Sequence, residues 1–160
     1  GPFVRLAVAV ECQPDLVGII YNTLLLNPEF GALGPRLSPA ADLEIFSPDY
    51  LNEKATLVGI LAVGSLDRDG SPFQGIPPLA AGVDALVSVM PEADLVRFHA
   101  GDNGPRLAYL PQLLSQTSPL IPHLVLRVLD RLAECFPQHA TQLAVLRGNM
   151  AWRTQVEQAG

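Results

Sequence analysis

Three carboxylates directly follow two stretches of sequence that have the character of buried strands. Glu11 follows the apolar run Phe3–Val10, while Asp67 and Asp69 follow the apolar run Thr56–Leu66. In an open α/β sheet, the residues beyond the carboxyl ends of the strands form the ligand-binding edge. We therefore expect the three side chains to lie together. Because carboxylate oxygens bind Mg²⁺, and a bound Mg²⁺ stabilises charge on a phosphodiester, the pattern predicts a magnesium site.

The order of these residues resembles the Toprim module of topoisomerases and bacterial primases. In that family a glutamate ends the first strand and a D-x-D motif ends the third, as Glu11 and Asp67-x-Asp69 do here. The later stretch Gly82–Gly101 is similar in layout to the strand, proline and acidic helix of primase-type members. The resemblance implies that Glu11 is catalytic in acid–base or metal chemistry and that both aspartates ligate Mg²⁺. It implies nucleic acid phosphodiesters as the substrate.

The same residues also have a purely structural interpretation. Asp67-Arg68-Asp69-Gly70 has the composition of a solvated turn, and Glu11 that of a helix-capping carboxylate. The adjacent thiol of Cys12 fits either a group activated by a helix N-terminus or a small buried hydrophobe. Both interpretations of this region stay open at the level of sequence.

Other catalytic and cofactor motifs are missing from the sequence. The three histidines, His99, His123 and His139, do not share a metal-ligand spacing. There is no G-x-S-x-G nucleophile motif, no G-x-G-x-x-G fingerprint and no phosphate-binding P-loop. We therefore expect no cofactor, apart from Mg²⁺ if the Toprim-like interpretation holds.

Short apolar runs alternate with helical patterns over the first two thirds of the chain. Strands are predicted at Phe3–Val10, Asp42–Phe46, Thr56–Leu66 and Val83–Met90, with an edge strand at Arg106–Leu110. Helices are predicted at Pro14–Leu26, after Ser47, and at Pro91–Ala100, Ser118–Phe136 and Gln138–Gln158, the last one continuous or broken near Gly148. Thr56–Leu66 also fits a helix. The alternation predicts an α/β fold with a mostly parallel sheet of about five short strands flanked by helices.

The predicted domain organisation is simple. We expect a single α/β domain at 3–160, with residues 111–160 as a helical segment packed on it, and Gly1-Pro2 as a remnant of tag cleavage. Charged residues make up only 16% of the chain, below the roughly 25% of an average soluble domain. The net charge of −6 argues against binding nucleic acid through phosphate neutralisation by this domain alone. No apolar run reaches the roughly 20 residues that a membrane-spanning helix needs.

Leucine, isoleucine and valine are abundant in Leu110–Leu132, beyond what one helix face of a small domain needs. An interaction surface is predicted at Leu120, Leu124, Val128 and Leu132, and ordinary core is the alternative. The leading functional prediction is a non-catalytic interaction or assembly module from a larger intracellular protein, cytoplasmic or nuclear. Its partner would be another protein, the rest of its parent chain or a second copy. The alternatives are the Toprim-like Mg²⁺-dependent domain and a small-molecule-binding α/β domain.

Overall fold

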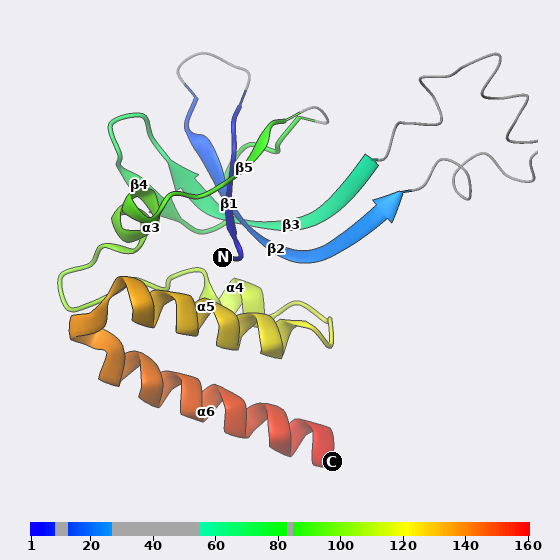
Figure 1. The fold of residues 1–160 in the computed structure, drawn as a ribbon, viewed down its shortest axis with the longest axis vertical. Helices are drawn as coiled ribbons and strands as arrows, with labels where there is room; N and C mark the ends of the chain where they lie inside the picture. Colours follow the sequence, from blue (N-terminus) through cyan, green and yellow to red (C-terminus); the bar gives the residue numbers. More distant parts are fainter. Residues whose placement is uncertain (9–12, 27–54, 83–84) are drawn as a thin grey trace, which may run out of the picture. The chain divides into compact units, whose positions relative to one another are not determined.

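The computed structural model describes residues 1–8, 13–26, 55–82 and 85–160 (Figure 1). The chain divides into two compact units, Gly1–Tyr21 with Ile60–Gly160, and Asn22–Gly59. The second unit contributes only the outer ends of two strands to the described residues. The fold below is that of the first unit, apart from the full bounds of those two strands.

A five-stranded sheet forms one layer, with the strand order β4-β3-β2-β1-β5. The strands are β1 (Phe3–Leu6), β2 (Asp15–Leu26), β3 (Ala55–Leu66), β4 (Pro72–Gln74) and β5 (Val87–Val89). The register pairs Phe3 with Ile19 between β1 and β2, and Val4 with Val89 between β1 and β5, and both pairings are antiparallel. β3 and β4 are also antiparallel, with Gly64 opposite Gln74.

The predicted mostly parallel sheet is therefore wrong, although the chain is an α/β domain with a C-terminal helix. The error begins at Pro14–Leu26, which is strand β2 over most of its length and not a helix. Without a helix between them, β1 and β2 lack the crossover that parallel neighbours require, and they form a hairpin instead. Val17, Ile19, Ile20 and Thr23 are β-branched, which favours the strand.

Several other predicted strands can be compared with the structure. The strand at Thr56–Leu66 is confirmed as β3, while β1 and β5 are shorter than the predicted runs. No strand forms at Arg106–Leu110, where a turn leads into helix α4 (Leu110–Leu114). The predicted strand Asp42–Phe46 and the helix start at Ser47 lie outside the described residues.

The helices of the second half match their sequence patterns. They are α3 (Glu92–His99), α5 (Ile121–Cys135) and α6 (Ala140–Ala159), with a short 3-10 turn η1 (Pro137–His139) between the last two. α6 runs through Gly148 without a break. In Figure 1, α5 lies between the strands and α6, so α5 has neighbours on two sides.

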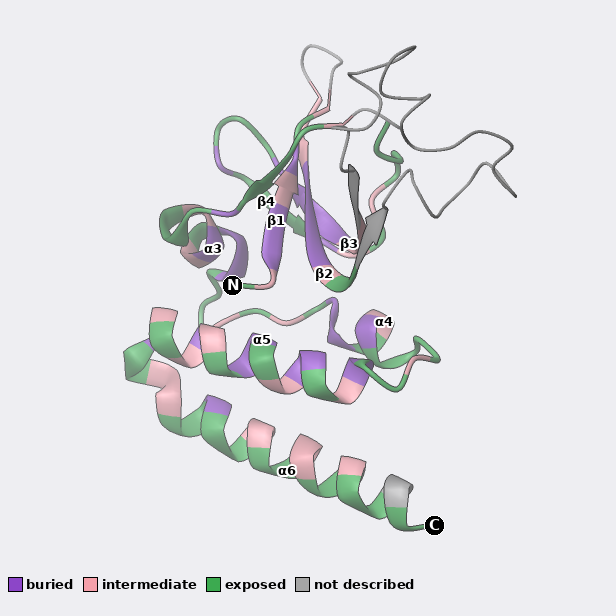
Figure 2. Cartoon of the chain, turned by 45° about the vertical axis from the view of Figure 1, so that its right-hand side comes forward, coloured by how far each residue is buried: buried purple, intermediate pink, exposed green. Residues whose placement is uncertain are grey.

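The main core lies between one face of the sheet and the helices. One cluster of buried side chains joins the strands to the helices. The strands contribute Phe3, Val17, Ile19 and Val63, α3 contributes Leu95 and Phe98, and the buried residues of α4 and α5 complete it. Figure 2 shows the buried stripe of α5 running along its length. A smaller cluster of Val4, Leu6 and Leu16 lies apart from it, as expected when side chains alternate between the faces of a strand.

The buried amide of Gln74 links β4 to the helical layer. Its Nε2 donates to the carbonyl oxygens of Phe98, at 3.0 Å, and Arg106, at 2.9 Å. Its Oε1 accepts from the backbone N–H of Ala108 at 2.8 Å. This side chain thus satisfies backbone groups around the end of α3 and before α4, which fixes the path of the chain there.

Candidate functional site

The predicted metal ligands Asp67 and Asp69 lie in the exposed turn between β3 and β4. The backbone N–H of Ser71 donates to Oδ1 of Asp69 at 2.8 Å, and this hydrogen bond lowers the pKa of the Asp69 carboxyl. Two backbone hydrogen bonds close the same turn, from Asp67 N–H to the Ser71 oxygen and from Gly70 N–H to the Asp67 oxygen. The Asp69 carboxylate therefore helps to stabilise the turn.

Glu11 and Cys12, the other two residues of the predicted site, lie outside the described residues. Whether Glu11 approaches Asp67 and Asp69 thus stays a prediction, and so do the catalytic role of Glu11 and the Mg²⁺ site. Within residues 1–8, 13–26, 55–82 and 85–160, no group of three His, Cys, Asp or Glu side chains is placed to hold a metal ion. Cys135, a free thiol in α5, has its pKa raised by burial, so it is not an activated nucleophile.

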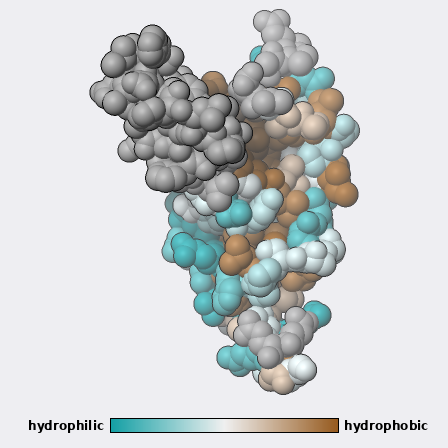
Figure 3. All heavy atoms as spheres, turned by 90° about the vertical axis from the view of Figure 1, so that its right-hand side faces the viewer, coloured by the Kyte–Doolittle hydropathy of each residue, from teal (hydrophilic) through white to brown (hydrophobic). Residues whose placement is uncertain are grey.

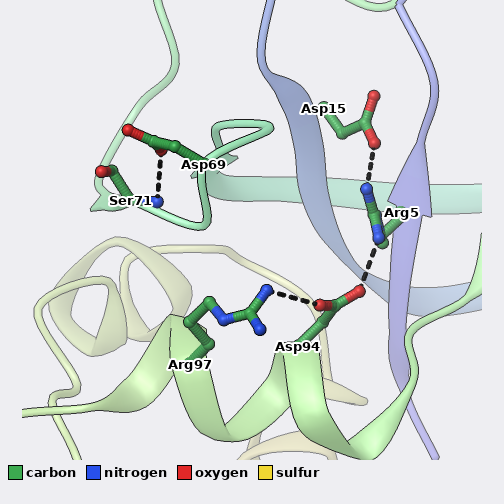
Figure 4. A network of polar contacts seen from close by, with 6 residues as sticks. All are labelled: Arg5, Asp15, Asp69, Ser71, Asp94 and Arg97. Atoms are coloured by element: carbon green, nitrogen blue, oxygen red, sulfur yellow. Dashed lines mark hydrogen bonds and ion pairs between the residues drawn. The ribbon is translucent and has the colours of Figure 1, made fainter.

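Charged side chains next to the β3–β4 turn form a network that joins the sheet to α3 (Figure 4). Arg5 of β1 pairs with Asp15 at the start of β2, and its Nη1 lies 2.5 Å from Oδ2 of Asp94 in α3. Asp94 also accepts from Arg97 at 3.4 Å. The opposite charges compensate one another, so this network is better suited to holding α3 on the sheet than to binding a ligand.

His99 and Tyr109 form the most strongly perturbed titratable pair. Both are fully buried, in an aromatic cluster with Phe3 and Phe98. His99 Nδ1 donates to the carbonyl oxygen of Leu95 at 2.8 Å, and Nε2 accepts from the Tyr109 hydroxyl at 2.9 Å. Burial lowers the pKa of His99 to about 4 and raises that of Tyr109. The imidazole is neutral and its hydrogen bonds are satisfied within the core.

The predicted interaction surface on α5 divides into buried and exposed positions. Leu124, Val128 and Leu132 are buried in the main core. Leu120, just before the helix, is 49% exposed. The surplus of apolar residues in this region is therefore largely explained by α5 being covered on two sides, and of the four predicted residues only Leu120 is available to a partner.

A different helix presents the exposed apolar side chains. On α6 the side chains of Val145, Trp152 and Val156 are 62%, 65% and 49% exposed. Leu143, Leu146 and Met150 on the opposite side of the helix pack against the main core. Successive residues of a helix are 100° apart, so the exposed set falls on one stripe directed away from α5.

We call this stripe the outer face of α6. It consists of Thr141, Ala144, Val145, Gly148, Trp152, Gln155 and Val156, all of them exposed. None of these residues is charged, although a solvent-facing helix surface normally carries charged and polar side chains. The charged side chains Arg147 and Arg153 of α6 lie on other sides of the helix, Arg147 with its guanidinium on Asp130. The outer face thus has the composition of an interface core, which is depleted in charge and enriched in tryptophan.

Two further surfaces carry exposed apolar groups. A groove of about 430 Å³ runs between the segment after α4 and the last turns of α6, with Leu114, Met150 and Arg153 in its lining. On the edge strand β5, Val89 is 69% exposed. In the space-filling view of Figure 3, hydrophobic residues gather in the upper half, where the strands are.

Fold and surface together define an α/β domain with an antiparallel sheet, a helical layer on one sheet face and an outer helix, α6, that has one uncharged face. A family model described as "Domain of unknown function (DUF8166)" matches residues 1–159, and the chain belongs to this family. No curated protein and no solved structure matches it. Among the described residues, none of the helices is long and apolar enough to cross a membrane.

The outer face of α6 was missed at the sequence level because the whole helix has a mixed composition. Its apolar residues are distributed over two opposite sides, one facing α5 and one facing outward. A signal was nevertheless present. Over 20 residues α6 carries three charged side chains, and none of them falls on the stripe through Val145 and Trp152.

Proposed function

We propose that this domain is a non-catalytic protein-interaction module and that it docks through the outer face of α6. The observation that carries the proposal is the exposed, uncharged stripe centred on Gly148, with Trp152 65% exposed. Exposing a tryptophan and two valines to water costs hydrophobic free energy, which a partner recovers by covering them. An intracellular, reducing setting belongs to the proposal and is supported by the free thiol of Cys135.

Tryptophan is well suited to this role. It is enriched among residues that dominate binding energy, because it combines a large contact area with few rotatable bonds. Trp152 is also the only tryptophan of the chain. The α6 helix that presents it packs on α5 through Leu143, Leu146 and Met150, which gives the docking face a rigid support.

Site-specific photocrosslinking in living cells tests the proposal. A photoreactive amino acid replaces Trp152, and adducts are identified by mass spectrometry. The matched control places the same group at Asp102, which is also exposed but lies in the turn after α3. We expect one dominant, identified adduct from position 152 that is lost when Val145→Asp introduces a charge into the outer face. Equal adducts at both positions, or no adduct at 152, would contradict the proposal.

A further inference from the structure

The groove between α4 and α6 has the dimensions of a small-ligand site. Its volume is about 430 Å³, and such sites measure roughly 300–1,000 Å³. Residues 114–119, the start of α5 and the last turns of α6 line it. Because α6 packs against the main core through Leu146 and Met150, the walls of the groove are held in place. We call this feature the α4–α6 groove.

Apolar side chains line the α4–α6 groove from both sides. Ile121 and Val125 of α5 border it as buried members of the main core. Leu114 is 41% exposed, so it offers apolar surface that water covers in the free chain. Met150 is half-buried, and its unbranched thioether adapts to the shape of a neighbour. An alkyl chain that enters this groove therefore gains free energy by leaving water.

The polar groups of the α4–α6 groove are suited to an anion. Among the described residues that line it, Arg153 carries the only charge. Its guanidinium has hydrogen-bond donors alone, in a fork that matches the two oxygens of a carboxylate. The hydroxyls of Thr117 and Ser118 belong to the same lining. The Ser118 oxygen already accepts from the backbone N–H of Leu120 at 3.4 Å, so its hydrogen is left to donate to a ligand.

Charge distinguishes this groove from the rest of the surface. The chain as a whole has a net charge of −6, which repels anions. Arg5, Arg131 and Arg147 pair with carboxylates of the chain itself, whereas no Asp or Glu is among the described residues that line the groove. We propose that the α4–α6 groove binds a small monocarboxylate with an alkyl chain, the chain on the apolar lining and the carboxylate on Arg153. This site is separate from the outer face of α6, so the inference goes beyond the proposed function and stands or falls independently of it.

An NMR titration of the methyl-labelled chain tests the proposal, with octanoate as the probe and octan-1-ol as its uncharged match. We expect octanoate to saturate with a dissociation constant of roughly sub-millimolar order. It should shift the methyl signals of Ile121 and Met150 in the groove, while those of Val145 and Val156 on the outer face of α6 stay unchanged. Octan-1-ol should bind about five to ten times more weakly, because it lacks the charge that pairs with Arg153. Octylamine, which is positively charged, should bind more weakly still.

Two matched pairs of variants locate the binding. Leu114→Asp adds a negative charge to the lining and should weaken octanoate binding about tenfold or more, whereas Leu120→Asp, at an exposed leucine outside the lining, should leave it unchanged. Arg153→Gln should reduce the affinity for octanoate to that for octan-1-ol and remove its salt dependence, and Arg127→Gln on α5 should do neither. Thermal unfolding confirms that each variant is folded. Octanoate that binds no more tightly than octan-1-ol, methyl shifts confined to the outer face, or equal losses in the two aspartate variants would overturn the inference.

Discussion

The Tyr109 hydroxyl donates a hydrogen bond to Nε2 of His99 across 2.9 Å in the centre of the core. This bond and the one from His99 Nδ1 to the Leu95 oxygen leave both ring nitrogens satisfied without charge. Tyr109→Phe keeps the ring and removes the donor, so a buried acceptor loses its partner. We expect the free energy of unfolding to fall by about 1–3 kcal/mol in urea denaturation.

Tyr21→Phe is the control for that measurement, because Tyr21 is 41% exposed and its hydroxyl can bind water. We expect little change there. If the two variants lose equal stability, the His99 hydrogen bond does not contribute to the core in the way described.

The pH dependence of stability follows from the same histidine. Burial lowers the pKa of His99 from 6.5 to about 4 in the folded state. Between these values the unfolded chain binds the proton and the folded chain does not, so stability falls as pH decreases from 6.5 towards 4. The full difference in pKa corresponds to a loss of about 3 kcal/mol in the free energy of unfolding. Urea denaturation at a series of pH values measures it.

The variant His99→Gln removes this contribution, so its stability should change less between pH 6.5 and pH 4 than that of the wild type. His123→Gln, at an exposed position on α5, is the matched control and should keep the wild-type slope. Identical slopes for wild type and His99→Gln would show that His99 is not held neutral.

Close packing at Gly64 predicts a strong glycine requirement. A Cβ atom there would lie 2.0 Å from the Phe73 carbonyl oxygen and 2.9 Å from the Phe98 ring. Gly64→Ala should therefore lower the free energy of unfolding by about 1–3 kcal/mol or more, because the Phe73 backbone next to the new methyl group cannot move away. Gly82→Ala, with free space around the new methyl group, should be neutral in the same denaturation experiment. Equal effects would contradict the packing of α3 on β3 and β4.

The ion network of Arg5 predicts a salt-dependent contribution. Arg5→Met leaves Asp15 and Asp94 without their shared cation. We expect the free energy of unfolding to fall by about 1 kcal/mol at low salt and by less at high salt, since these side chains are partly exposed. Arg68→Met in the exposed β3–β4 turn serves as the control. A loss that does not depend on salt would point to packing of the arginine stem instead.

Substitutions of Asp69 distinguish its structural role in the β3–β4 turn from its predicted role as a Mg²⁺ ligand. Asp69→Ala removes the acceptor for Ser71 N–H and should lower the melting temperature equally with and without Mg²⁺. Asp69→Asn keeps an oxygen acceptor and should melt close to wild type under both conditions. If Mg²⁺ raises the melting temperature of the wild type but not of Asp69→Asn, the predicted site of Glu11, Asp67 and Asp69 gains direct support.

Local sequence signals determined helices α3 and α5, whereas α4 begins at Leu110, where an edge strand was predicted. α3 and α5 follow from proline near their first turns and from apolar residues at helical spacing, which are local signals. Local signals also favoured the strand Ala55–Leu66, because it is rich in β-branched residues and a turn bounds it, although its apolar run fits a helix as well. Such signals depend on residues close in sequence, and they hold wherever the segment packs.

Tertiary structure alone decided that Asp15–Leu26 is a strand and which side of α6 faces the core. Asp15–Leu26 is mostly apolar, so its sequence fits a buried helix as well as a buried strand, and pairing with its neighbours β1 and β3 selects the strand. That choice turned the sheet antiparallel. Likewise, no pattern in α6 says which of its two apolar sides will face α5. Packing through Leu143, Leu146 and Met150 placed one side of α6 against the core and left Val145, Gly148 and Trp152 exposed. Strand pairing and helix docking both depend on contacts between residues far apart in sequence, which local patterns do not specify.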